Sequence, residues 1–188
     1  NMKLCPFCKT PPAKSVEENA ERVKKLMKMG NAQAFHQLAG RYVSGDYDLL
    51  QDYAKANELY LKAGELGFAQ AYFNLGAAYE EGRGVTIDKK KAKYYYELAA
   101  MNGSVKSRHN LGCAEYEAGN YQRAYAHFII AARAGCKESL DVVKGGYTVG
   151  IVTKDGYANA LRAYQKSQDE MKSEARDKAW AAINEMAD

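Results

Sequence analysis

The stretch AYFNLGAAYEEGRGVTIDKKKAKYYYELAAMNG, residues 71–103, has the pattern of two short helices joined by a turn. Within each half, apolar residues recur at spacings of three and four, which is typical of a helix with one buried face. The first stripe holds Ala71, Leu75 and Tyr79, and the second holds Ala92, Tyr95, Tyr96, Ala99 and Ala100. Because each stripe needs a partner, the sequence predicts a helical hairpin.

Glycines and one aspartate mark where these helices meet and where they end. Gly76 lies in the middle of the first helix, where glycine costs about 1 kcal/mol relative to alanine. It therefore predicts a point where the backbones of two helices approach too closely for a side chain. Gly82 and Gly84 predict a left-handed end to the first helix, and Asp88 predicts an N-cap for the second.

Weaker copies of this hairpin recur on both sides of residues 71–103. The pairs Ala56 and Gly67, Ala92 and Gly103, and Ala124 and Gly135 have the same separation, eleven residues. First-helix counterparts are Ala34, Leu38 and Tyr42 before this stretch and Ser107, Leu111 and Gly112 after it. Repetition at this period predicts a row of hairpins that share small cores, rather than one conventional core.

The repeats divide the chain into seven predicted segments. An N-terminal segment with a CPFC motif and a proline-containing linker covers 1–14, and a leading helix covers 15–30, opened by a capping box at Ser15 and Glu18. Repeats follow at 31–67, 68–103 and 104–135, the last with a shorter loop. A degenerate repeat at 136–171 and a capping helix at 172–188 complete the chain. The predicted N-caps of the second helices are Asp52, Asp88, Asn120 and Asp155, and the degenerate repeat places Ser139, Val143, Tyr147 and Gly150 on its first helix and Ala160 on its second.

Composition narrows the classes of function. The 188 residues carry a net charge of +4, with acidic and basic residues interspersed, which argues against a nucleic-acid partner. No apolar run approaches the roughly 20 residues that a membrane span needs, so we expect no membrane insertion. Four cysteines, two of them isolated, suit a reducing compartment, and we expect an intracellular, cytoplasmic protein.

The string A-x-x-x-L-G-x-x-Y-x-x-G-x-G-V-x-x-D-x-x-K-A-x-x-Y-Y-x-x-A-A-x-x-G, complete in residues 71–103, resembles the Sel-one-like repeat, a relative of the tetratricopeptide repeat. The resemblance extends from about residue 20 to about residue 171, with departures at Ala39, Glu115 and Lys144. It implies an all-α fold, a right-handed superhelix (solenoid) of antiparallel helix pairs. It also implies a non-catalytic scaffold or adaptor that binds proteins or peptides.

The motif Cys5-Pro6-Phe7-Cys8 supplies two thiols from one turn, which is half of a tetrahedral zinc site. It resembles the closing Cys-Pro-x-Cys of a RING finger. That resemblance implies a second hypothesis, in which this chain is the substrate-binding region of a ubiquitin ligase whose other six zinc ligands precede residue 1. The partner would then include the ubiquitin-conjugation machinery. The plain alternative is a tail that binds no metal.

In the tetratricopeptide geometry that the resemblance implies, the first helices line a concave surface where a partner binds. Phe73 and Tyr116 would be apolar anchors, and Lys106 would face a carboxylate. Asn74 and Asn110 resemble in position the asparagines that hold a peptide backbone in related repeats. A solvated helix face would have a similar pattern. The predicted partner-binding residues are Gln33, His36, Gln70, Phe73, Asn74, Lys106, His109, Asn110 and Tyr116, with Val43 and Glu80 beside them.

Catalytic and metal sites have little support in the sequence. His109 and Cys113 have the spacing of two metal ligands on one helix, but no third ligand is nearby, and a packing cysteine is the favoured interpretation. The three histidines fall in different predicted helices and no nucleophile motif occurs, so we expect neither an enzyme nor a cofactor. A third hypothesis is a disulfide-dependent β-lactam-binding repeat enzyme. Members of that class carry a cysteine pair in each repeat, and here only Cys113 and Cys136 share one.

Overall fold

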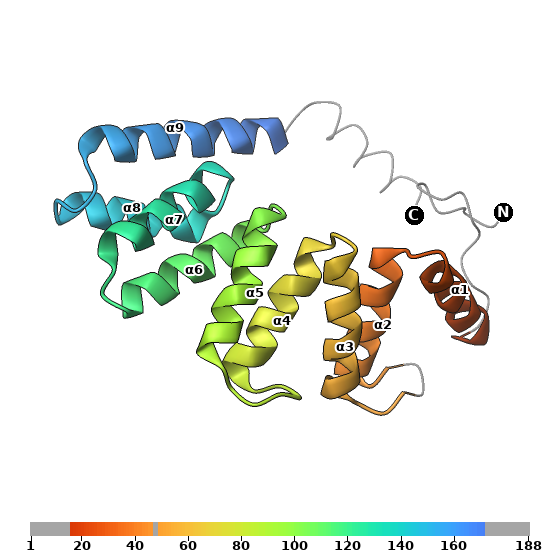
Figure 1. Ribbon diagram of the computed structural model, residues 1–188. Coiled ribbons are helices and arrows are strands. Elements are labelled where there is room, and N and C mark those ends of the chain that lie inside the picture. Colours follow the sequence, from red (N-terminus) through yellow and green to blue (C-terminus); the bar gives the residue numbers. More distant parts are fainter. Residues whose placement is uncertain (1–15, 47–48, 172–188) are drawn as a thin grey trace. The chain divides into compact units, whose positions relative to one another are not determined.

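The structure is a computed structural model that describes residues 16–46 and 49–171, and within those ranges it contains nine α-helices and no strand (Figure 1). The predicted all-α fold class is therefore confirmed. The helices are α1 (Val16–Lys28), α2 (Ala32–Ser44), α3 (Tyr53–Glu65), α4 (Ala69–Glu81), α5 (Lys89–Met101), α6 (Val105–Glu117), α7 (Tyr121–Arg133), α8 (Lys137–Thr148) and α9 (Lys154–Met171). None of them is long and apolar enough to cross a bilayer.

The helices form two compact units, and the boundary between the units follows Asn102. Unit 1 contains α1 to α5, and unit 2 contains α6 to α9. In unit 1, each helix packs against the next along the chain, from α1 to α5. In unit 2, α6 packs against α7, α7 against both α8 and α9, and α8 against α9. Each unit is thus a set of hairpins in which neighbours in sequence are neighbours in space.

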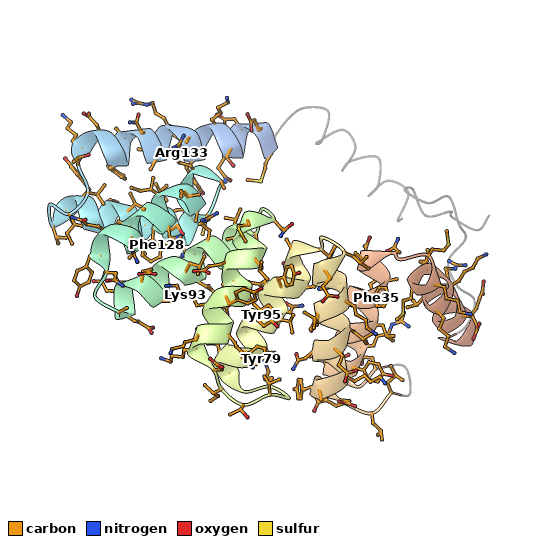
Figure 2. All side chains as sticks on the ribbon, in the orientation of Figure 1. Phe35, Tyr79, Lys93, Tyr95, Phe128 and Arg133 are labelled. Carbon is orange, nitrogen blue, oxygen red and sulfur yellow. The ribbon has the colours of Figure 1, made fainter. Side chains whose placement is uncertain are left out.

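Small side chains bring the helices of unit 1 together. Ala39, Ala56, Ala63 and Ala71 have at most 1% of their surface exposed, and Leu59 and Leu75 fill the space between them. Tyrosines cover the edges of this core. The rings of Tyr72 and Tyr79 stack on Tyr95 at 6.1 and 5.5 Å, and Figure 2 labels the last two. The alanine and leucine positions of the repeat pattern therefore form the core, while Tyr42, Tyr79 and Tyr95 are only partly buried around it.

Gly76 is a point of close approach, but the group that approaches is a side chain. A Cβ atom added at Gly76 would lie 2.5 Å from Cδ1 and 2.6 Å from Cε1 of Tyr96. The prediction that two backbones meet there is therefore wrong, and an aromatic ring from α5 fills the gap that the glycine leaves. Gly82 and Gly84 have φ of 76° and 70°, as predicted for the left-handed end of α4.

Unit 2 has a core of larger side chains. Phe128 and Tyr125 from α7 pack with Leu140 and Val143 from α8, and Ala160 from α9 is fully buried among them. Ser139 is also fully buried, at the place that Ala71 occupies in unit 1. Tyr147 differs, because it is 38% exposed and stacks on Tyr157 rather than entering the core. α9 runs for 18 residues without interruption.

Two of the predicted N-caps make capping hydrogen bonds, a third is the N-cap residue without such a bond, and the fourth prediction is wrong. Asp52 accepts from the amide of Lys55, and Asp88 accepts from those of Lys90 and Lys91. Asn120 is the N-cap residue of α7, but its side-chain amide donates to Glu115 Oε2 at 2.8 Å and makes no capping bond. Asp155 already lies inside α9, where Thr153 Oγ1 accepts from the amide of Gly156. The capping box at Ser15 and the helix at 172–188 lie outside or at the edge of the described residues, so both stay predictions.

Candidate functional site

Three of the predicted binding residues of unit 1 are hydrogen-bonded to one another. Gln70 donates to Asn74 Oδ1 at 3.3 Å, and Asn74 Nδ2 lies 3.2 Å from His36 Nε2. His36 comes from α2, whereas the other two come from α4. The chain of side chains therefore joins the first helices of two consecutive repeats. All three side chains are partly buried, so part of their predicted capacity to bind a partner is used inside the molecule.

His36 is packed among aromatic rings. Its ring centroid lies 5.4 Å from that of Tyr60 and 4.7 Å from that of Phe68. Burial lowers the pKa of His36 below its ordinary value of 6.5, because the charged imidazolium loses hydration there. Burial also raises the pKa of Tyr60, against the opposing effects of a hydrogen bond to Asn74 and the charge of Arg83. His36 is thus neutral near pH 7, and its ring packs against Tyr60 and Phe68.

The other predicted residues of unit 1 divide between solvent and core. Gln33 is exposed on α2, as is Glu80 on α4. Phe73 is partly buried, with its ring 5.8 Å from that of Tyr96. Tyr96 in turn donates its hydroxyl to Glu80 Oε2 at 2.7 Å. Since Phe73 supports the ring that fills the space above Gly76, it serves packing as well as any partner.

In unit 2, the predicted residues lie on α6 in different surroundings. Lys106 is exposed, and Asn110 is partly buried. Tyr116 is 46% exposed, with its ring held edge-on at 5.0 Å from Tyr121 and 6.4 Å from Tyr125. His109 Nδ1 lies 2.8 Å from Ser139 Oγ on α8. The aromatic anchor predicted at Tyr116 is therefore the exposed one of the pair, whereas Phe73 is not.

A small pocket of unit 1, here called the polar groove, has a volume of about 80 Å³. Asn57 donates to the carbonyl oxygen of Arg83 at 2.8 Å, which ties the loop after α4 onto this pocket. Arg83 Nε lies 3.0 Å from Glu81 Oε2. The lining residues are Val43, Tyr53, Asn57, Tyr60, Asn74, Ala78 and Arg83.

A larger pocket of unit 2, here called the apolar groove, has a volume of about 570 Å³. That volume is within the range of pockets that hold a ligand or a large side chain. Residues of α6, α7 and α8 line it together with Val149, which follows α8, and Glu117 is the charged residue among them. The lining residues are Cys113, Tyr116, Glu117, Tyr125, Phe128, Val142, Gly145 and Val149.

The two grooves occupy equivalent places in the repeat. Ala124 and Ser139 lie 68 residues after Ala56 and Ala71, and this offset relates three of the seven residues that line the polar groove to residues that line the apolar groove. It pairs three polar lining residues of unit 1 with less polar ones of unit 2: Asn57 with Tyr125, Tyr60 with Phe128, and Asn74 with Val142. The loop residue Arg83 pairs with Ile151, which is 47% exposed and does not line the apolar groove. Equivalent positions in the two units therefore have linings of different polarity. The repeat spacing could have located this pair of sites, but sequence reasoning missed the lining residues from α3, α7 and α8.

A family model described as Sel1 repeat matches residues 32–68, 69–104 and 105–136, more than half of the chain. The chain belongs to the Sel1 repeat family. The Sel1-like repeat-containing protein L21 of Acanthamoeba polyphaga mimivirus is 39% identical to it over 62 residues, which are 33% of this chain and 12% of the viral protein. The RING resemblance of the N-terminal motif has no counterpart in these matches.

Solved structures with Sel1 repeats have the same fold. The protective antigen c5321 of uropathogenic Escherichia coli, which displays an SLR fold, superposes with a TM-score of 0.70 at 29% identity, over 86% of this chain and 35% of that one. A Sel1 repeat protein from Oxalobacter formigenes superposes with a TM-score of 0.67 at 23% identity, over 82% of this chain and 66% of that one. The Sel1 repeats here therefore belong to the helical solenoid class. The right-handed superhelix stays a prediction. This chain spans about a third of the antigen and a small part of the viral protein.

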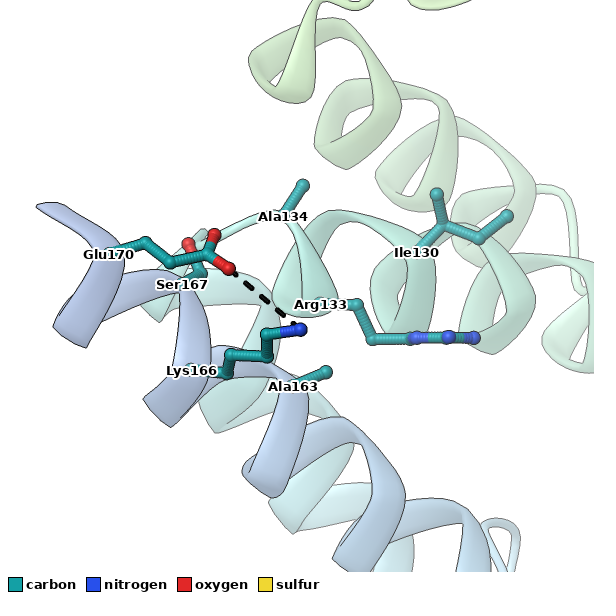
Figure 3. A pocket seen from close by; sticks show the side chains of 7 residues that line it. All are labelled: Ile130, Arg133, Ala134, Ala163, Lys166, Ser167 and Glu170. Atoms are coloured by element: carbon teal, nitrogen blue, oxygen red, sulfur yellow. Dashed lines mark ion pairs between the residues drawn. The ribbon is translucent and has the colours of Figure 1, made fainter.

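A third pocket in this Sel1 protein, of about 430 Å³, lies between the end of α7 and α9 (Figure 3). Its lining includes Arg133 and Lys166, and Lys166 Nζ lies 3.9 Å from Glu170 Oε1. Both side chains of this ion pair are largely exposed, so the pair adds little stability. The pocket is shallow, and the charges that line it are solvated.

The cysteines of the third Sel1 repeat are thiols. Cys113 and Cys136 form no disulfide. Cys5 and Cys8 lie outside the described residues, so the predicted half of a zinc site is untested. Across residues 16–46 and 49–171, no three His, Cys, Asp or Glu side chains gather as metal ligands. His109 and Cys113 do meet, with Sγ 3.6 Å from Nε2.

Proposed function

We propose that this chain binds a segment of a partner protein, and that the apolar groove of unit 2 takes an apolar side chain of that segment. Sel1 repeats typically mediate protein–protein interaction. The observation that carries the proposal is the groove of about 570 Å³ between α6 and α8, with an aromatic floor. Buried aromatic pockets of this kind commonly hold the residues that dominate binding energy.

Charge and shape narrow the partner. Glu117 at the rim favours a lysine or arginine beside the apolar anchor, because opposite charges at a rim help to select the partner. Tyr116 forms one wall and is held by Tyr121 and Tyr125, so little side-chain entropy is lost on contact. The proposed ligand is therefore an extended or helical segment with an aromatic or aliphatic residue next to a basic one.

The polar groove of unit 1 is a weaker candidate for a side chain. Its volume of about 80 Å³ has room for little more than ordered water. His36, Gln70 and Asn74 already satisfy one another, and Phe73 packs on Tyr96. Gln33 of unit 1 and Lys106 of unit 2 are both exposed, and each is left as a polar contact on the first helix of its own repeat.

The test is selection of peptides from a random 12-residue library on the full chain, followed by measurement of Kd for the best peptide. We expect the selected peptides to share an apolar residue beside a lysine or arginine. Tyr116→Ala should weaken binding by about tenfold or more, as expected for a tyrosine hot spot. Tyr94→Ala is the matched control, since Tyr94 is 55% exposed on α5 and lines neither groove. An unchanged Kd for Tyr116→Ala would remove the apolar groove as the site.

The ubiquitin-ligase hypothesis depends on Cys5 and Cys8 alone. It has a separate test, which is whether the parent reading frame upstream of residue 1 carries further pairs of cysteine and histidine. A frame without them would leave this chain as a binding module only.

A further inference from the structure

The apolar groove contains a thiol beside an imidazole. Cys113 lies one turn after His109 on α6, and its Sγ is 3.6 Å from His109 Nε2. That distance is within hydrogen-bonding range for sulfur. A cysteine becomes a nucleophile when a base accepts its proton, and an adjacent histidine is the usual base.

A third side chain orients the imidazole from its other edge. Ser139 Oγ, on α8, lies 2.8 Å from His109 Nδ1, and Ser139 is fully buried. The ring also lies against Phe128, with centroids 5.4 Å apart. With Nδ1 protonated and donating to Ser139, Nε2 is left to accept the thiol proton. After that transfer, the imidazolium donates to the serine oxygen on one side and to the sulfur on the other. The thiol of Cys113, the imidazole of His109 and the hydroxyl of Ser139 are thus linked in a row, with the first two on α6 and the third on α8.

The groove gives this thiol an apolar approach. Cys113 is partly buried but lines the cavity, together with Val142, Val149 and the ring of Tyr116. A reagent with an apolar group can therefore reach the sulfur while that group is buried against these residues. Polar reagents lose hydration there without a matching gain.

Cys136 provides a contrast in the same molecule. It is partly buried at the start of α8, and its Sγ donates to Glu138 Oε2 at 3.3 Å. A carboxylate faces this sulfur where an imidazole faces Cys113. Cys136 lines neither the apolar groove nor the pockets of about 430 and 460 Å³ in unit 2.

We propose that Cys113 is a covalent modification site for apolar α,β-unsaturated carbonyl compounds, with His109 as general base and Ser139 as a positioning residue. The thiol proton moves to His109 Nε2 and the sulfur bonds to the β-carbon of the acceptor. The π pair of the C=C bond shifts to the α-carbon, which then takes the proton back from the imidazolium. The product is a thioether, and no oxidant or further reactant is required.

The experiment labels the full chain at pH 7 with N-phenylmaleimide, an apolar acceptor of this class, and with N-(2-hydroxyethyl)maleimide, a polar one. Mass spectrometry of tryptic peptides resolves the rate at each cysteine. In the wild-type chain, we expect Cys113 to react faster than Cys136 with the apolar reagent. The ratio of apolar to polar rates should also be higher at Cys113.

Two variants test whether the imidazole of His109 acts as a base or only supports the structure. His109→Gln should lower the Cys113 rate by about tenfold or more and leave the Cys136 rate unchanged. Ser139→Ala should lower the Cys113 rate by less. Its fold should be intact, since alanine is the residue at the equivalent buried place, Ala71. Circular dichroism checks that each variant is folded.

Two outcomes would overturn the proposal. One is a Cys113 rate in the wild-type chain no greater than that of Cys136, with the same ratio of the two reagents at both sites. The other is an unchanged Cys113 rate in a folded His109→Gln variant. The wild-type comparison needs no substitution, so it decides the matter even where a variant fails to fold.

Discussion

Replacement of Gly76 by alanine tests whether the ring of Tyr96 packs directly on the backbone of α4. The added Cβ would lie 2.5 Å from Cδ1 of that ring, far inside van der Waals contact. Tyr96 is 3% exposed, so its ring has no open space to enter. It must move, and with it the hydroxyl that donates to Glu80 Oε2 at 2.7 Å.

Three effects set the size of the change in the free energy of unfolding. Overpacking of a core costs about 1–3 kcal/mol. Loss of the tyrosine hydrogen bond costs about 0.5–1.5 kcal/mol. Alanine gains about 1 kcal/mol over glycine in a helix interior. Gly76→Ala should therefore destabilise the protein by about 1–3 kcal/mol, the helix gain being smaller than the other two effects together.

The chain offers a matched control in Gly40, which lies inside α2 with no atom within 4 Å of the position of an added Cβ. Gly40→Ala should stabilise the protein by up to about 1 kcal/mol, because only helix propensity changes. Urea unfolding followed by circular dichroism at 222 nm measures both. With a slope near 2 kcal/mol per M, a loss of 2 kcal/mol lowers the midpoint by about 1 M. A Gly76→Ala midpoint equal to or above that of the wild type would refute the packing of Tyr96 on Gly76.

Three further predictions concern other features of the structure. Burial lowers the pKa of His36 below 6.5, so as the pH falls this histidine is protonated in the unfolded chain before it is protonated in the folded one. The folded state is therefore expected to lose stability, and the urea midpoint to fall, as the pH drops below about 6.5. The fall should be smaller in the His36→Gln variant. An equal fall in both proteins would contradict this assignment. Thr153→Ala should lower the free energy of unfolding by about 1 kcal/mol, because the N-cap of α9 is lost, and Asp155→Ala should lower it by less. Thermal melts compare the two variants. A larger loss in Asp155→Ala would show that the aspartate is the N-cap. Phe128→Ala should cost about 3–5 kcal/mol, since the side chain is 2% exposed at the centre of unit 2, and a smaller loss in urea unfolding would show a core that collapses around the gap.

Local spacing predicted the elements of the fold, while contacts between elements decided the rest. The alanine stripes required hairpins, and Ala56, Ala71 and Ala124 are indeed fully buried. Asn120 is the N-cap residue of α7, as its place before a helix predicts, but its side-chain amide donates to Glu115, a buried residue of the preceding helix, and makes no capping bond. A sequence pattern shows that a helix begins near a residue, without showing which neighbour competes for its side chain.

The predicted binding residues show the same limit. His36 and His109 were identified as surface positions from their register on the first helix, and each is partly buried by rings from the next helix, Tyr60 and Phe128. Exposure on a repeat is set by the neighbouring helix as much as by the helix itself. The lining of the apolar groove was missed for the same reason, since its floor comes from α7 and one wall from α8.

The shared register of the polar and apolar grooves has a consequence for protein engineering. The polarity of each groove depends on a few side chains at matching positions, Asn57 and Tyr60 in unit 1 and Tyr125 and Phe128 in unit 2. Replacement of Asn57 and Tyr60 on α3 by tyrosine and phenylalanine would remove the Asn57 side chain that donates to the carbonyl oxygen of Arg83. The polar groove would then have an apolar lining like that of the apolar groove. Substitution at these few positions in any repeat would therefore be expected to change the polarity of its groove without a change of fold.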